Sequence, residues 1–96
     1  THEKIRLTDE EWKEITESVD AVFDDFTRRL HESFPSLTPK DVIFCCLVKL
    51  NVNMQDLSDI YCVSKAAISK RKFPLKTEKL GITDEHLSLD DFLKDF

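Results

Sequence analysis

The sequence predicts an all-α fold: a helical bundle of about five helices that contains a helix-turn-helix and is preceded by a long amphipathic helix. One glycine and three prolines leave few places for turns. Apolar residues recur every three or four positions, which is the period of an α-helix. Residues that cap helices stand before each apolar segment. We divide the chain into residues 1–36, an N-terminal helix that packs on or extends the domain, and residues 37–96, the helix-turn-helix with a short C-terminal helix.

The composition is typical of a folded domain, with 41% apolar and 34% charged residues. No apolar segment is long enough to cross a bilayer, and no signal peptide opens the chain. We therefore expect a cytoplasmic protein. The chain begins at Thr1 without a methionine, which indicates a fragment, and any link to a membrane would lie upstream of it.

The first helix is predicted to begin after Thr8, because Glu11 completes a capping box with it. The charged pair Asp24 and Asp25 is expected on the solvated face of this helix. The apolar residues of this helix form one stripe, which is predicted to face the core. The length of the stripe also leaves open a homodimer through residues 12–30. The stripe is formed by Trp12, Ile15, Val19, Val22, Phe23, Phe26 and Leu30.

The second helix is expected to be the most buried, since apolar residues cover most of its circumference. Phe34 precedes a proline and so ends the helix before it. Thr38 then caps the second helix, with Pro39 at its first position. Asn51 ends it, because asparagine accepts the left-handed conformation better than most residues.

Two short helices follow, joined by a tight turn at residues 61–63. Asn53 caps the third helix and Ser64 caps the fourth. Ser58 is small at the point where the two helices would approach each other. This arrangement predicts a helix-turn-helix, a motif that can place its second helix in the major groove of DNA.

The last part of the chain is predicted to form one more short helix. Gly81 is a natural stop for the preceding helix, and Ser88 caps the next one. Apolar residues of this segment would dock it onto the body of the domain. They are Leu89, Phe92, Leu93 and Phe96.

The net charge of −5 argues against nucleic acid at first sight, but the charge is unevenly distributed. Residues 64–80 contain six basic residues and only one acidic residue, whereas residues 1–36 and 81–96 are both acidic. A local positive field can attract a polyanion in spite of the overall charge. Residues 64–80 are therefore the expected contact with DNA.

The helical period divides the candidate DNA-binding residues into two groups, if Ile68 faces the core. Side chains that can meet base edges lie on the outward face of a recognition helix over residues 64–73. They are Ser64, Lys65, Ala66, Ser69, Lys70 and Phe73. The predicted phosphate contacts are Thr38, Asn53, Gln55, Arg71, Lys72, Lys76 and Lys79.

Residues 37–82 resemble the LuxR-type helix-turn-helix, a relative of sigma-factor region 4. The resemblance rests on Leu37-Thr38 at a helix start, Cys62-Val63-Ser64 at the turn, and Leu80-Gly81-Ile82 at the finish. It implies the DNA-binding output domain of a bacterial transcription regulator, with a helical-repeat sensor upstream. Such domains usually act as dimers on paired half-sites.

The sequence departs from the LuxR-type pattern at two positions. Cys62 stands where the family has glycine, although a cysteine adopts the left-handed conformation poorly. Pro74 lies within what should be a continuous recognition helix, where proline removes a backbone hydrogen bond. We expect a kink or break near Phe73, with residues 75–80 continuing separately, so that the contacts from Lys76 and Lys79 are the least certain to form.

Other chemistries have little support in the sequence. Cys45 and Cys46 are read as buried apolar residues in a reducing compartment, and His2, His31 and His86 are isolated from one another. We predict no catalytic site, metal, cofactor or small-molecule substrate. The alternative function is a protein-interaction or dimerisation module that has lost DNA binding. A small helical enzyme is a weaker idea, because it would need a concave polar pocket.

Overall fold

The computed structural model describes residues 7–96, and its regular elements are all helical, which confirms the predicted all-α class. In order along the chain they are α1 (Asp9–Val22), α2 (Phe26–Ser33), α3 (Pro39–Lys49), α4 (Met54–Tyr61), α5 (Lys65–Pro74), the π-helical segment η1 (Leu75–Lys79) and α6 (Leu89–Asp95).

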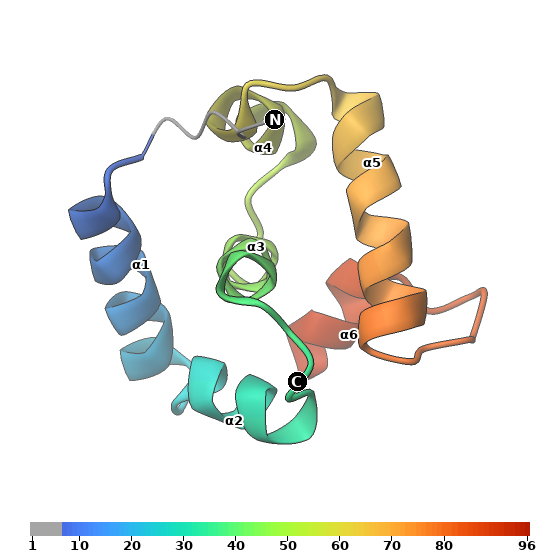
Figure 1. The fold of residues 1–96 in the computed structure, drawn as a ribbon, viewed down its shortest axis with the longest axis horizontal. Coiled ribbons are helices and arrows are strands. Elements are labelled where there is room, and N and C mark those ends of the chain that lie inside the picture. Colours follow the sequence, from blue (N-terminus) through green and yellow to red (C-terminus); the bar gives the residue numbers. More distant parts are fainter. Residues whose placement is uncertain (1–6) are drawn as a thin grey trace.

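Helix α3 lies at the centre of the molecule, with the other helices arranged around it (Figure 1). It contributes six buried side chains to one core, namely Val42, Phe44, Cys45, Cys46, Leu47 and Val48. The same core includes Trp12 and Val19 of α1 and Leu30 of α2. The second helix predicted from the sequence corresponds to α3, and its central, buried position is confirmed. Residues 7–36 pack on the domain rather than extend away from it.

The prediction of one continuous first helix is wrong, because the chain turns between α1 and α2. Asp24 and Asp25 both have positive φ, so they form this turn and do not lie on a solvated helix face. The Asp20 carboxylate accepts hydrogen bonds from the Thr27 backbone N–H at 2.7 Å and from its hydroxyl at 2.6 Å. These bonds hold the start of α2 against α1 and replace the bonds of a straight helix.

Arg29 satisfies the backbone at the same turn. Its guanidinium donates to the carbonyls of Asp24 at 2.8 Å, Phe23 at 2.7 Å and Phe96 at 2.6 Å. The turn is therefore held by the far end of the chain as well as by its neighbours. It allows the apolar residues of α1 and α2 to face α3 from two directions.

The predicted helix starts are confirmed by their hydrogen bonds. Thr8 and Thr38 each form a complete capping box, with Glu11 and Asp41 respectively. The side-chain oxygens of three further caps accept a backbone hydrogen bond from the third residue of their helix. These caps are Asn53 of α4, Ser64 of α5 and Ser88 of α6.

Three helices end on a residue other than glycine in the left-handed conformation: Asp24, Asn51 and Cys62. In each case the next backbone N–H bonds to a carbonyl five positions earlier, as at Val63 to Ser58 (3.0 Å). Such closure satisfies carbonyls that a helix end leaves unpaired. Asn51 ends α3 as predicted.

Pro74 changes the winding of the helix without ending it abruptly. Helix α5 runs to Pro74, and residues 75–79 continue as η1, in which the Leu80 N–H reaches the Leu75 carbonyl at 3.0 Å. The missing N–H of proline explains the change, because the regular hydrogen bond from residue 74 cannot form. The predicted break near Phe73 is confirmed in this form, and Gly81 (φ 68°) follows η1.

Helix α6 docks through apolar and aromatic residues, as predicted. Leu89 and Leu93 are buried, and Phe92 and Phe96 lie beside Phe34 with ring centroids 6.0 Å away. The Lys49 ammonium donates to the carbonyls at the end of α6, those of Leu93 (2.8 Å) and Lys94 (2.9 Å).

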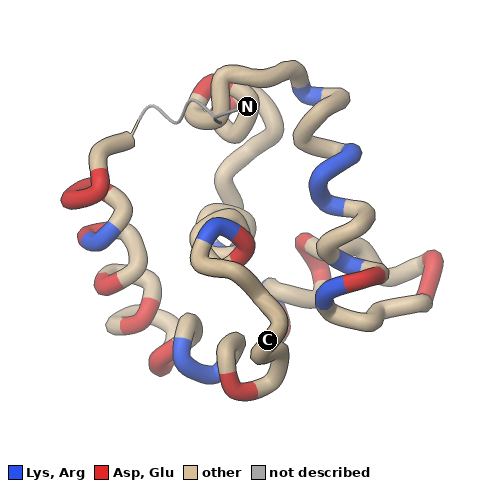
Figure 2. The backbone as a smooth tube through the Cα atoms, viewed as in Figure 1, with Lys and Arg blue, Asp and Glu red and all other residues tan. Residues whose placement is uncertain are grey.

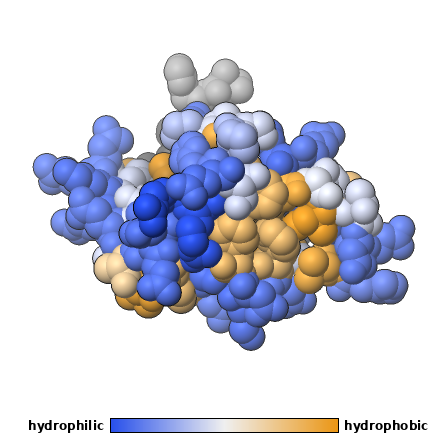
Figure 3. Space-filling model, turned by 90° about the horizontal axis from the view of Figure 1, so that it is seen from below, coloured by the Kyte–Doolittle hydropathy of each residue, from blue (hydrophilic) through white to orange (hydrophobic). Residues whose placement is uncertain are grey.

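On the face seen in Figure 3, apolar residues gather between hydrophilic margins. Within residues 7–96, no helix is long and apolar enough to cross a membrane.

Candidate nucleic-acid interface

Helices α4 and α5 are held together by a small apolar contact and a tight turn. Leu57 and Ile68 are buried, and so is Ser58, whose hydroxyl donates to the Gln55 carbonyl at 2.8 Å. Cys62 adopts the left-handed conformation that the turn requires (φ 55°). Cys62 thus ends α4 in a conformation that a cysteine adopts poorly.

Five of the six residues predicted to face bases lie on the outward face of α5, and the sixth, Ser64, precedes the helix and caps it through the Ala67 N–H. All six are exposed: Ser64, Lys65, Ala66, Ser69, Lys70 and Phe73. Phe73 is 65% exposed, which is unusual for so large an apolar side chain. Because Ile68 is buried on the opposite side, the helix presents these residues to solvent while its inner side packs on the core. The exposure of these residues, predicted from the helical period, is therefore confirmed.

Arg71 lies on the inner side of α5, not on its outer surface. Its guanidinium carbon is 5.0 Å from the ring centroids of both Phe44 and Tyr61. Tyr61 in turn lies 6.5 Å from Trp12, so this aromatic cluster joins α1, α3, α4 and α5. The expectation that Arg71 projects outward to a phosphate is corrected, since its side chain positions α5 against α3 and α4.

The other predicted phosphate contacts on this segment also have partners within the protein. Lys72 forms an ion pair with Asp90 at 2.9 Å, and Lys79 forms one with Asp41 at 3.5 Å. The Lys76 ammonium donates to the carbonyl of Asp84 at 2.8 Å. These lysines are therefore not the free cations that the sequence suggested.

Thr38, Asn53 and Gln55 are exposed at helix starts, as predicted. The side-chain oxygens of Thr38 and Asn53 are occupied, because they cap α3 and α4. The Gln55 amide donates to Asp59 at 3.1 Å. The Thr38 N–H is occupied too, by the Asp41 carboxylate at 3.0 Å, and Pro39 has no N–H. A phosphate contact through backbone N–H groups is therefore better placed at the start of α4, beside Asn53.

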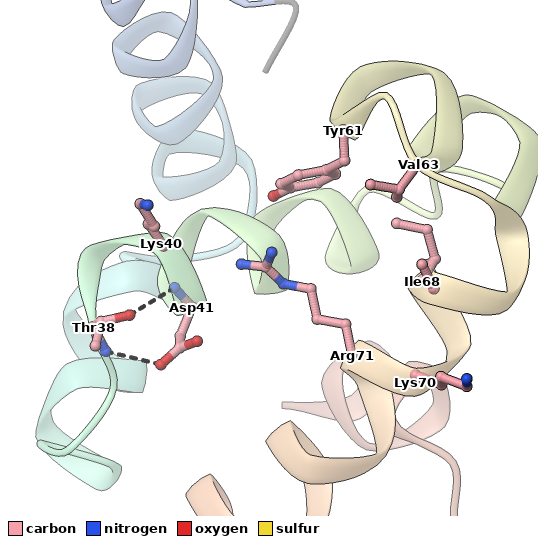
Figure 4. A pocket seen from close by; sticks show the side chains of 9 residues that line it. Thr38, Lys40, Asp41, Tyr61, Val63, Ile68, Lys70 and Arg71 are labelled. Carbon is pink, nitrogen blue, oxygen red and sulfur yellow. Dashed lines mark hydrogen bonds between the residues drawn. The ribbon is translucent and has the colours of Figure 1, made fainter. Parts of the chain in front are cut away.

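A groove of about 420 Å³ separates the start of α3 from α4 and α5 (Figure 4). Its margins include Lys40 of α3 and Lys70 and Arg71 of α5. Lys40 was not among the predicted DNA-binding residues, although it follows the predicted cap at Thr38 by only two positions. The proximity of Lys40 to α5 depends on how α3 packs against α4 and α5, which the local pattern does not reveal.

The charges are segregated in space as well as in sequence. Acidic residues gather on α1 and basic residues on α5, on opposite sides of the molecule (Figure 2). The positive field is therefore strongest beside the exposed face of α5. The acidic surface of α1 lies away from it, where it interferes least with a bound polyanion.

The described residues offer little for other chemistry. Burial, with a smaller contribution from nearby acidic groups, raises the pKa of the Cys45 and Cys46 thiols from 9.0 to about 12. Such thiols are poor nucleophiles and poor metal ligands at neutral pH. Cys62 is exposed. Across residues 7–96 no group of three His, Cys, Asp or Glu side chains could hold a metal, and His2 lies outside these residues.

Comparisons with protein-family models, with curated proteins and with solved structures gave no match for this chain.

Proposed function

We propose that this chain is a sequence-specific DNA-binding domain that inserts the N-terminal half of α5 into the major groove. The proposal rests chiefly on the exposed face of α5. Lys65 and Lys70 project there beside Ser69 and Ala66, and within residues 7–96 neither lysine forms an ion pair. A helix that exposes these side chains and follows the turn of a helix-turn-helix is suited to reading base edges.

Each group on this face has a chemical counterpart in the groove. Lysine and serine side chains can donate hydrogen bonds to guanine or other base edges, and Ala66 can contact a thymine methyl group. The backbone N–H groups at the start of α4 can bind a phosphate and so help to fix the orientation of the domain. In the full protein we expect this domain to be the output module of a bacterial transcription regulator.

A binding measurement with matched lysine variants tests the proposal. Lys65→Ala and Lys70→Ala should each weaken binding to duplex DNA and flatten the dependence of log affinity on log salt. Lys13→Ala is the matched control, because Lys13 is also exposed but lies on α1, on the far side of the molecule (Figure 2). Equal effects of all three variants, or no binding by the wild-type domain at low salt, would contradict it.

The alternative is a protein-interaction module with a helix-turn-helix shape. It is favoured by the internal partners of Lys72, Lys76 and Lys79, which leave fewer cations for a phosphate backbone. The same salt titration separates the two functions. A domain that binds no DNA at about 50 mM salt, where phosphate contacts are strong, would support the alternative.

A further inference from the structure

Acidic residues from outside the helix-turn-helix lie against the basic segment formed by residues 64–80. Asp90, at the start of α6, holds the Lys72 ammonium through both carboxylate oxygens, at 2.9 and 3.2 Å. Asp41 pairs with Lys79 at 3.5 Å. The segment therefore has a smaller effective positive charge than its sequence indicates.

The pair of Lys72 and Asp90 differs from an ordinary surface pair in its exposure. The Lys72 side chain is only 18% exposed, whereas that of Asp90 is 48% exposed. The Asp90 side chain is thus more accessible to an approaching molecule than the lysine side chain that it holds. A DNA phosphate near Lys72 would meet a negative charge there.

Asp90 is held in this position by the packing of α6. Leu89 and Leu93 on either side of it in the helix are buried, and Lys49 binds the carbonyls at the end of the same helix. The packing of α6 therefore fixes the backbone position from which Asp90 reaches Lys72.

We infer that Asp90 is a built-in competitor of DNA phosphates for Lys72 and that it limits the affinity of the domain for DNA. This inference rests on the proposed DNA-binding function. A lysine already neutralised by a carboxylate adds little to the binding of a phosphate and releases few counterions from DNA. Replacement of Asp90 by a neutral residue frees Lys72 and adds one phosphate contact.

The test compares Asp90→Asn with Asp91→Asn in binding to one duplex DNA. The two aspartates are adjacent in the first turn of α6, both are exposed, and both variants change the net charge equally. In the part of the chain that the structure describes, Asp91 forms no ion pair with a lysine. Asp90→Asn should raise the affinity by about 2- to 5-fold more than Asp91→Asn does.

The salt dependence gives a second readout. The slope of log affinity against log salt should become steeper by about 0.9 in Asp90→Asn, as expected for one additional phosphate contact. Lys72→Gln should remove this gain when combined with Asp90→Asn. Circular dichroism of each variant verifies that it is folded.

The outcomes separate the inference from the proposed function. If the wild-type domain binds DNA through Lys65 and Lys70 but Asp90→Asn matches Asp91→Asn or binds more weakly, the inference alone is wrong. If neither the wild type nor folded Asp90→Asn binds DNA at low salt, the proposed function is wrong and the inference falls with it.

Discussion

Cys62 occupies a backbone conformation that costs an L-residue about 1–2 kcal/mol and a glycine almost nothing. We predict that Cys62→Gly raises the free energy of unfolding by about 0.5–1 kcal/mol, since the added freedom of glycine in the unfolded chain offsets part of the gain. Denaturant unfolding measures the change. DNA binding should be unaffected, because Cys62 lies in the turn and not on the outward face of α5.

Gly81 provides the control for this prediction. It has a φ of 68°, and a Cβ added there would meet no atom within 4 Å. Gly81→Ala should therefore lower the free energy of unfolding by about 1 kcal/mol through the backbone conformation alone. Destabilisation by Cys62→Gly, together with a normal response of Gly81→Ala, would show that the Cys62 side chain makes contacts that outweigh the strain.

The buried thiols predict a loss of stability at alkaline pH. In the unfolded chain Cys45 and Cys46 ionise near 9.0, but in the folded protein burial raises their pKa to about 12. The contribution of the buried, neutral thiols to the free energy of unfolding is complete below pH 9.0 and is lost as the pH rises toward 12. Each thiol should lower the free energy of unfolding by about 1.4 kcal/mol per pH unit in this window.

Unfolding in denaturant at about pH 8 and about pH 10, with reductant present, measures this loss. The double variant Cys45→Ala/Cys46→Ala should lose about 2–3 kcal/mol less than the wild type between these two conditions. Other groups that titrate at high pH are common to both proteins and cancel in the comparison. The same pH dependence in both proteins would contradict the prediction.

Residue-level predictions from sequence succeeded where the cause was local. The caps at Thr38, Asn53 and Ser64 depend on residues three positions away, so the sequence displays both partners. The prediction of where the Arg71 side chain points was wrong for a different reason. It follows the buried Ile68 by three positions and so shares its inward face, but its charge led us to place it outside.

At the scale of the element, Pro74 separates the surface that we propose to read DNA from the segment that follows. All the residues proposed to face bases precede it, and η1 follows it. We predict that Pro74→Arg leaves the preferred DNA sequence unchanged and strengthens binding through an added charge. Selection of DNA sequences with the purified wild-type and variant domains measures both properties.

Pro74→Ala is the matched control, since it restores the missing N–H without adding charge. Stronger binding by Pro74→Arg alone would assign the gain to the charge. A changed sequence preference in both variants would show instead that the winding at Pro74 sets the angle at which α5 reads the groove.

The break between α1 and α2 could not be read from the local pattern. Apolar spacing continues through Phe23 and Phe26, so the period indicates one helix. The turn depends on the bond between Asp20 and Thr27 and on Arg29 reaching the carbonyl of Phe96, far along the chain. Two consecutive aspartates, which are poor helix formers, were the available signal. The ion pair of Lys72 and Asp90 was equally hidden, because it joins separate helices.

At the scale of the whole molecule, the predicted dimer stripe is mostly used within the domain. Trp12, Val19, Phe26 and Leu30 are buried in the core, and of this stripe only Val22, at 70%, is largely exposed. A stable interface needs about 1,000 Å² of buried surface or more, which one valine cannot supply. We predict that this domain is a monomer in the absence of DNA.

Sedimentation at concentrations in the micromolar range checks the oligomeric state. The wild type and Val22→Asp should both sediment as monomers and with the same coefficient. A wild-type dimer that Val22→Asp dissociates would contradict the prediction and restore the stripe at residues 12–30 as a dimer surface.

The docking of α6 has a consequence for folding during synthesis of the protein. Leu89 and Leu93 complete the core around α3, and the carbonyl of Phe96 receives Arg29 from α2. A chain growing on the ribosome can form its earlier helices, but it lacks these partners until residue 96 has left the exit tunnel. We therefore expect the nascent domain to expose apolar surface of α3 until then, and to be a substrate for chaperones during that interval.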